Sequence, residues 1–185
     1  MTMTNTSNRT FTVPTREEVS ATNQAIFDKL NGAIGFVPNL YAYFSKSETA
    51  LADYVTFQNR KSTLKAKERE VINLVTSQIN GCRYCPSAHT AIGKMNGFTD
   101  EQVIEIRGGA ASWDSKLDAL AKFTTSVVEN KGRATIDSRE AFFAAGYTEG
   151  NLVDVIIVVG DKIISNYIHN LTGFAIDFPL APELV

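Results

Sequence analysis

Apolar residues recur three and four positions apart along most of the 185-residue chain, the spacing that places them on one face of a helix. Val71, Leu74, Val75 and Ile79 follow this spacing, and Asn80-Gly81 directly after them is a typical helix end. Comparable patterns and capping residues predict helices over residues 15–32, 40–44, 47–61, 64–79, 83–96, 99–108, 115–129, 138–145 and 148–171. The chain is therefore expected to be all-α.

The last predicted helix contains the run Val155 to Val159, which alone would also fit a buried strand. We interpret it as helix because its surroundings keep helical spacing and offer no hairpin partner. A helix that is apolar on nearly all sides needs cover on all sides. It is expected either at the centre of the domain or against another subunit. Large aromatic residues elsewhere are expected in the core: Trp113, Phe123, Phe142 and Phe143.

Composition indicates an ordinary globular protein, with 44% apolar and 21% charged residues. We expect a disordered tail over residues 1–12 and a single helical domain over residues 13–185, whose irregular apolar end includes Phe178 to Pro182. The net charge of −2 gives no basic footprint for nucleic acid. The start of the chain lacks the apolar segment of a secretory signal, and no apolar run is long enough for a bilayer. These features predict a cytoplasmic protein that binds neither nucleic acid nor membrane.

The chemistry is expected where both cysteines of the chain stand, at Cys82 and Cys85, with His89 four residues further on. Pro86 fits only in the first turn of a helix, so this helix should start near Arg83. At about 100° per residue the two thiols and the imidazole share one helical face. A thiol near a helix start and beside an imidazole has a lowered pKa, and the thiolate is the reactive form. The stretch therefore predicts a thiol redox centre.

Glu70 is the candidate for orienting His89. If the helices before and after Gly81 form an antiparallel hairpin, Glu70 lies eleven residues before the turn and His89 eight residues after it. At roughly 1.5 Å per residue their axial offset is about 4–5 Å. Glu68 lies further away and is the weaker candidate. Spacing alone leaves Glu70 open as an ordinary solvated charge in the first turns of a helix.

Two other interpretations of the cysteine pair remain open at this point. The thiols could simply fill a core, as free cysteines often do. They could also bind zinc together with His89, with Glu70 or a water as fourth ligand. Nothing in the sequence places His169, the only other histidine, near this site.

The spacing Glu70-x11-Cys82-x2-Cys85-x3-His89, led by Ser77-x-Ile79-Asn80-Gly81, resembles the active-site motif of alkylhydroperoxidase D (AhpD) in the carboxymuconolactone decarboxylase-like superfamily. Two further segments resemble its "peroxidase-related" branch, namely residues 35–40 and 166–182. The resemblance covers about residues 15–182. It implies an AhpD-like all-helical fold with a helical-hairpin core, assembled as a homo-oligomer (dimer, trimer or hexamer).

The resemblance also implies the activity and the roles of the residues. The protein would reduce a hydroperoxide substrate without a cofactor or metal. Cys85 would attack the peroxide, Cys82 would close a disulfide, and an external dithiol would reduce the pair. Glu70 and His89 would form a proton relay. Tyr84 stands where well-studied members carry a histidine of the relay; a phenol with a pKa of about 10 can donate a hydrogen bond there but is a poor base.

Overall fold

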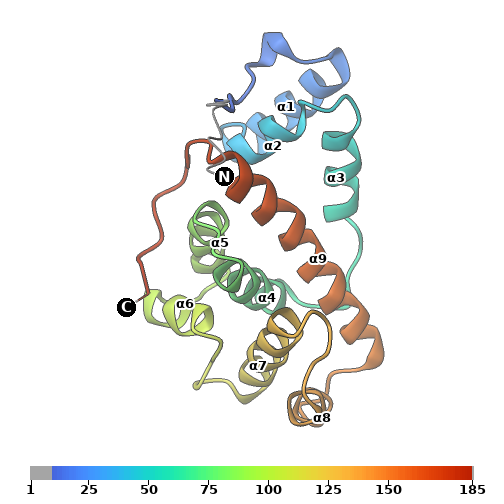
Figure 1. Ribbon diagram of the computed structural model, residues 1–185, viewed down its shortest axis with the longest axis vertical. Helices are drawn as coiled ribbons and strands as arrows, with labels where there is room; N and C mark the ends of the chain where they lie inside the picture. The colour runs from blue at the N-terminus through green and yellow to red at the C-terminus, as the bar shows by residue number, and fades with distance from the viewer. Residues whose placement is uncertain (1–9, 185) are drawn as a thin grey trace, which may run out of the picture. The chain divides into compact units, whose positions relative to one another are not determined.

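The computed structural model describes residues 10–184, and every regular element in this range is a helix (Figure 1). The all-α prediction is confirmed. Residues 10–15 have no regular structure, while the rest of the expected tail lies outside the described residues. Within the described range no helix combines the length and apolarity that crossing a membrane requires.

The chain divides into two compact units, each with its own packing. Among the described residues, the first contains residues 10–57 together with 172–175, and the second contains residues 58–171 and 176–184. The single domain expected over residues 13–185 stays a prediction. All residues of the predicted site belong to the second unit.

The first unit is built from four short elements and part of the chain's end. They are η1 (Arg16–Glu18), α1 (Ala21–Ile34), α2 (Asn39–Phe44) and α3 (Ala50–Gln58). The sequence predicted one helix from Thr15, but the chain leaves the helical conformation at Val19 and α1 starts after Ser20, whose side chain caps it. Stacked rings of Phe44 and Tyr54, 4.1 Å apart, form part of the unit's core.

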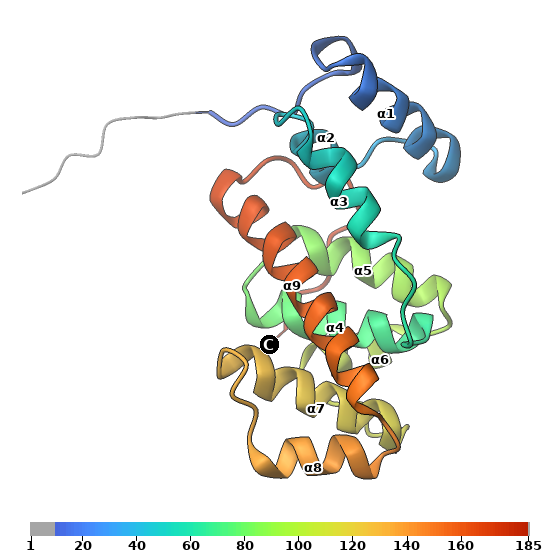
Figure 2. The ribbon, with the colours of Figure 1, turned by 90° about the vertical axis from the view of Figure 1, so that its right-hand side faces the viewer.

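The second unit packs its helices around α4 (Figure 2). They are α4 (Ala66–Ile79), α5 (Tyr84–Met95), α6 (Asp100–Arg107), α7 (Ser115–Glu129), α8 (Ile136–Ala144) and α9 (Glu149–Thr172). α4 contacts α5, α6 and α7, and α8 packs on α7. Val71, Leu74 and Val75 of α4 are fully buried and Ile79 is partly buried. Phe123 and Phe142 stack in the same core with ring centroids 4.3 Å apart. Their predicted burial is confirmed.

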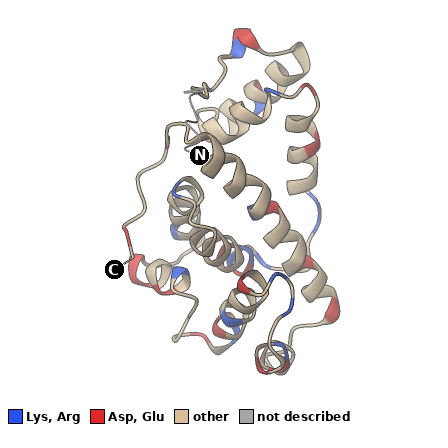
Figure 3. Cartoon of the chain, viewed as in Figure 1, with Lys and Arg blue, Asp and Glu red and all other residues tan. Residues whose placement is uncertain are grey.

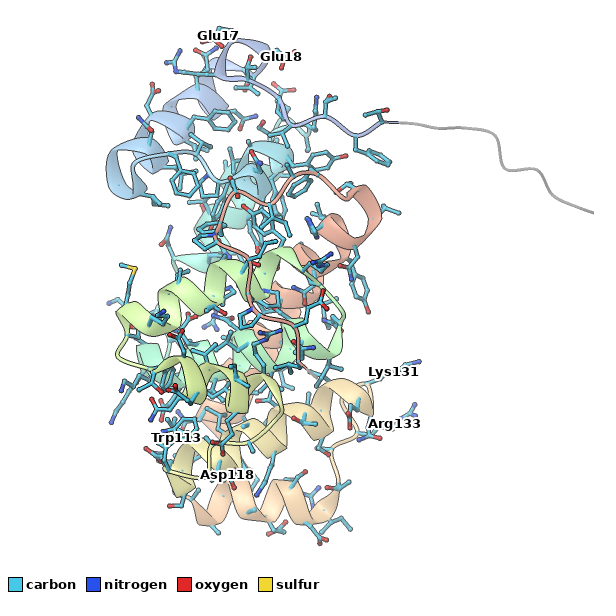
Figure 4. All side chains as sticks on the ribbon, turned by 90° about the vertical axis from the view of Figure 1, so that its left-hand side faces the viewer. Glu17, Glu18, Trp113, Asp118, Lys131 and Arg133 are labelled. Atoms are coloured by element: carbon cyan, nitrogen blue, oxygen red, sulfur yellow. The ribbon has the colours of Figure 1, made fainter. Side chains whose placement is uncertain are left out.

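Trp113 departs from the expectation of a core position, because 38% of it is exposed. It lies in the connection between α6 and α7, where Figure 4 labels it near Asp118. This connection is held by Asp118, which accepts a hydrogen bond from the backbone of Ala111 at 2.9 Å. This polar contact, rather than burial of the indole, anchors the connection.

The chain does not cover α9 on all sides, so a central position in the domain is wrong, while cover by another subunit stays a prediction. Val155 is fully buried, whereas Val153 and Ile156 are exposed. Much of the buried face of α9 is instead made of polar side chains. Charged residues are spread over several helices rather than gathered on one (Figure 3).

Candidate active site

The turn between α4 and α5 sets the position of both cysteines. Gly81 has a φ of 64°, in the left-handed region that favours glycine. The backbone N–H of Cys82 donates to the carbonyl of Ser77 at 3.1 Å, which folds the chain back over the end of α4. α5 then begins at Tyr84. The helical hairpin predicted around Gly81 is therefore present.

Cys82 lies in this turn and not on the helix, which differs from the helical face predicted for all three side chains. Its sulfur accepts a hydrogen bond from the backbone N–H of Cys85 at 3.4 Å, so it caps the start of α5. Cys85 lies in the first turn, with Pro86 directly after it. Both thiols are free and buried. The two sulfurs thus meet at the positive end of the helix dipole.

Glu70 and His89 lie together, as the hairpin spacing predicted. Oε2 of Glu70 is 2.8 Å from Nδ1 of His89, and its other oxygen accepts from the amide of Asn73 at 3.0 Å. Glu68 is occupied elsewhere, because it accepts from the backbone N–H of Lys65 at the start of α4. Burial opposes ionisation of Glu70, but His89, the nearby Lys162 and Asn73 outweigh it and hold the pKa of Glu70 below its ordinary value.

Lys162 of α9 completes the chain of contacts from the other side. Its Nζ is 3.1 Å from Nε2 of His89 and 3.3 Å from a carboxylate oxygen of Asp161. Only 4% of Lys162 is exposed. An ammonium group only donates, so Nε2 of His89 accepts from it and Nδ1 carries the proton that His89 donates to Glu70. This fixes the ring in one tautomer and orientation.

Cys85 is the activated thiol of the pair. A hydrogen bond from Cys82 is the main cause. The positive charge of Lys162, the electrostatic effect of His89 and the hydroxyl of Ser165 add to it against the opposing effect of burial. Together they lower the pKa of Cys85 to about 5. Sγ of Cys85 is 3.7 Å from Oγ of Ser165. The lowered pKa favours the thiolate form of this sulfur.

Cys82 is the opposite case. Its hydrogen bond to Cys85 holds the proton on Cys82, and burial and the negative charge on Cys85 act in the same direction, so the pKa of Cys82 is raised. One thiolate and one thiol form a shared pair whose proton stays on Cys82. This asymmetry agrees with the unequal roles expected for the two cysteines.

His169 was not predicted at this site, but α9 brings it there. Its Nδ1 is 3.8 Å from Sγ of Cys82, and only 8% of the residue is exposed. The ring of Tyr84 lies 5.3 Å from the His169 ring and 5.7 Å from that of Phe178. Tyr84 is buried on the Cys82 side of the site, away from the Glu70–His89 pair in these contacts.

A polar stripe on α9 is the part of the site that sequence reasoning missed. Lys162, Ser165, Asn166 and His169 are all buried and recur at steps of three and four residues. Asn166 bonds Ser77 and Asn80 of the hairpin at 3.1 Å and 3.0 Å, which fixes α9 against it. The signal was present, because helical spacing of polar residues inside an apolar helix marks a buried polar face.

A cleft of about 270 Å³ lies beside Cys82, between the start of α5 and the C-terminal segment. Its lining includes Cys82, Arg83, Pro86, Arg107, Pro182 and Glu183. Arg107 donates to the carbonyl of Pro182 at 2.6 Å, and the backbone of Ala181 donates to Ser87 at 3.1 Å. These bonds hold the segment in place beside Cys82.

The zinc interpretation finds no ligand set in this arrangement. Among the described residues, no group of three or more His, Cys, Asp and Glu side chains is disposed to hold a metal ion. His89 directs both ring nitrogens to protein partners, Glu70 and Lys162. The donors proposed for zinc are therefore engaged with one another.

Known proteins share both a sequence signature and the fold. Residues 45–132 match the model of the Carboxymuconolactone decarboxylase family. Among curated proteins, none matches the chain in sequence. Solved structures with the same fold include a peroxidase-related protein with an alkylhydroperoxidase AhpD core from Ralstonia eutropha JMP134, with a TM-score of 0.81 and 20% identity over 90% of this chain and 91% of that one.

Two more solved structures show how widely the fold is used. A peroxidase-related protein from Silicibacter sp. TM1040 has a TM-score of 0.79 and 21% identity over 99% of this chain and 97% of its own. The debrominase Bmp8, in complex with 2,3,4-tribromopyrrole, has a TM-score of 0.74 and 14% identity over 92% and 94%. The family match over residues 45–132 and this shared fold agree with the resemblance to the AhpD-like, carboxymuconolactone decarboxylase-like superfamily that the sequence motif indicates.

Proposed function

We propose that the protein is a thiol peroxidase that reduces hydroperoxides through a cycle of the Cys85 and Cys82 thiols. The observation that carries the proposal is the buried Cys85 thiol, whose pKa is lowered to about 5 beside a chain of contacts from Lys162 through His89 to Glu70. A thiolate is the nucleophile that peroxide reduction needs. The similar proteins named peroxidase-related support the same class of activity.

In the first step the thiolate of Cys85 attacks one oxygen of the peroxide and breaks the O–O bond. Cys85 becomes a sulfenic acid, and the leaving alkoxide takes a proton to give an alcohol. The Glu70–His89–Lys162 chain has an ammonium group and an imidazole that can supply this proton. In the second step Cys82 attacks the sulfenic sulfur, a disulfide forms and water leaves.

An external dithiol would then return the pair to the reduced state. Of the two cysteines, Cys82 lines the cleft, so an incoming thiolate would attack its sulfur there. Cys85 would leave as a thiolate, and a thiol with a low pKa is the better leaving group. A supply of dithiol fits a reducing compartment, so we propose that the protein works in the cytoplasm.

Peroxide consumption by the reduced protein, with excess dithiol, tests the proposal. Replacing Cys85 with Ser removes the nucleophile, and replacing Cys82 with Ser removes the resolving thiol, so both variants should fall to background turnover. With one equivalent of an organic hydroperoxide, only a protein that retains Cys85 should yield a sulfenic acid trapped by dimedone. Wild-type peroxide turnover in both variants would refute the proposal.

Two competing outcomes are measured on the same preparation. Stoichiometric zinc that remains bound under reducing conditions would favour the alternative in which the protein is a zinc-stabilised or redox-sensing oligomer that binds a partner. Because the debrominase Bmp8 shares the fold, a brominated pyrrole is included as a substrate. Turnover of that compound without peroxide turnover would assign the thiols to a different reaction.

A further inference from the structure

The second step of the proposed cycle needs a proton acceptor at Cys82. The attacking form of a thiol is the thiolate, yet the pKa of Cys82 is raised by its hydrogen bond to Cys85 and by burial. Once Cys85 has become a sulfenic acid, its negative charge is gone but Cys82 remains a buried thiol. Some group within reach of its sulfur must take the proton for the disulfide to form.

The His89 ring is committed to Cys85's side of the site. Its Nδ1 bonds Glu70 at 2.8 Å and its Nε2 bonds Lys162 at 3.1 Å. Neither nitrogen is directed at Cys82 in these contacts. The base that serves Cys82 has to come from elsewhere.

His169 is the titratable side chain in contact with Cys82 from α9. Nδ1 of His169 lies 3.8 Å from Sγ of Cys82, a length at which a sulfur and a nitrogen share a hydrogen bond. The unprotonated nitrogen of a neutral imidazole is an acceptor, which suits this ring to take up a proton. The group that faces the His169 ring from α5 is Tyr84, at 5.3 Å between centroids, and a phenol is a donor at neutral pH.

We propose that His169 is the general base of the disulfide-forming step, an inference that rests on the proposed peroxidase cycle. Its Nδ1 takes the proton of the Cys82 thiol as the sulfur attacks Cys85. The S–O bond of the sulfenic acid breaks, the S–S bond forms, and the leaving hydroxide takes up a proton to become water. The oxidant is the peroxide of the first step, so no further electron acceptor is needed.

The position of His169 gives the site a proton donor and a base on one helix face. Lys162 and His169 lie two turns apart on the buried face of α9, with Ser165 and Asn166 between them. The first acts on the Cys85 side through His89, and the second contacts Cys82 directly. The structure thus separates the proton transfers of the two steps.

Single-turnover kinetics on His169→Asn tests this assignment. Asn places an amide near the position of Nδ1 but cannot accept a proton. Reduced wild type and variant are mixed with one equivalent of cumene hydroperoxide, and sulfenic acid and disulfide are followed by quenching and intact mass. Sulfenic acid should form within about twofold of the wild-type rate, while disulfide formation should slow by about 10²-fold, the usual effect of a lost general base. The sulfenic acid then accumulates.

A second variant and a control separate a chemical effect from a structural one. His169→Gln should behave like the Asn variant, and normal sulfenic acid formation in either shows that the Cys85 side is intact. Tyr167→Phe, on the exposed face of the same helix, should leave both steps unchanged. Disulfide formation at the wild-type rate in both His169 variants would overturn the inference while leaving the peroxidase proposal standing. Wild type that forms neither sulfenic acid nor disulfide with the peroxide would overturn the peroxidase proposal, and the inference with it.

Discussion

Near Cys85, the neutral His89 ring links a carboxylate to an ammonium group, and this ammonium group contacts a second carboxylate. The carboxylate of Glu70 holds the His89 ring, His89 accepts from the ammonium group of Lys162, and Lys162 also contacts the carboxylate of Asp161. A buried ammonium is tolerated only with such partners. The arrangement places a cation beside a thiol that has to ionise, so the reactivity of Cys85 depends on Lys162 as well as on the residues of the hairpin.

Replacing Lys162 with Met should raise the pKa of Cys85. The positive charge of Lys162 is one of the causes that lower it to about 5, and a nearby opposite charge typically shifts a pKa by about 1–3 units. The measurement is the pH dependence of Cys85 alkylation by iodoacetamide, resolved by peptide mass. Wild type should react at a plateau rate above about pH 6, whereas the inflection of the variant should move up by at least about one unit.

Lys122→Met is the matched control for this prediction. Lys122 is an exposed residue of α7 that pairs with Asp118 four residues before it, so its removal should leave the alkylation profile of Cys85 unchanged. An inflection that stays near pH 5 in a folded Lys162→Met protein would show that Lys162 does not activate the thiol.

Among the individual residues of the site, the sequence predicted those of the helical hairpin and missed those of α9. Glu70 and His89 could be paired because a short turn at Gly81 fixes the register of two consecutive helices. Lys162 and His169 are more than 70 residues further along the chain. Sequence spacing does not tell which turn of a distant helix such as α9 packs against the hairpin. Only packing in three dimensions supplies that register, through bonds such as Asn166 to Ser77.

Among the elements, α9 reverses the usual amphipathic pattern in its C-terminal half, because its buried face is polar and its exposed face is apolar. Lys162, Ser165 and His169 are buried there, while Tyr167 and Leu171 are 58% and 77% exposed. Starts and ends of most helices agreed with the sequence, because caps and turns are local: α7 runs over Ser115–Glu129 as predicted. The orientation of α9 was not predicted, because its apolar run dominates the pattern, although the helical spacing of its polar residues carried the signal.

The N-terminal half of α9 is anchored by Asp154. Its carboxylate accepts hydrogen bonds from Arg60 at 2.7 Å, from Ser62 at 3.1 Å, and from the backbone and hydroxyl of Thr63 at 2.6 and 2.7 Å. Burial opposes its ionisation, but the bonds from Thr63, Arg60 and Ser62 outweigh it and hold the pKa of Asp154 well below its usual range. One side chain thus ties the chain before α4 to α9.

Asp154→Asn should lower the free energy of unfolding by about 2 kcal/mol at pH 7, because several donors lose an ionised acceptor. The pKa of Asp154 is lower in the folded state, so its stabilisation is present above the unfolded-state pKa of about 3.9 and is lost as the pH falls towards the folded-state value. The gap between wild type and variant should therefore shrink below about pH 4, by about 1.4 kcal/mol per pH unit. Urea denaturation at several pH values measures it.

An exposed aspartate at a helix start provides the control. Asp137→Asn in the first turn of α8 should change the free energy of unfolding by no more than about 0.5 kcal/mol. A gap for Asp154→Asn that stays constant from pH 7 to pH 3 would contradict the assignment, because it would mean that Asp154 is not the group that titrates.

For the whole molecule, the outer face of α9 is the feature that the single chain leaves unexplained. Val153, Ile156, Ile164, Tyr167 and Leu171 are each at least 43% exposed, and at about 100° per residue they form one stripe along the helix. Apolar side chains gathered on an exposed helix face mark a site of association. The alternative left open by the sequence, in which another subunit covers this helix, agrees with such a stripe.

We therefore expect the protein to form a homo-oligomer through the outer stripe of α9. Light scattering should give a mass that is a multiple of the 20.3 kDa chain. Replacing Ile156 and Ile164 together with Lys places two charges where a second copy would exclude water, so the variant should elute at the mass of one chain. Ile136→Lys, at a position of α8 that is 68% exposed, adds the same charge outside the stripe and should keep the oligomer. Wild type that stays at 20.3 kDa at tens of micromolar would refute the expectation.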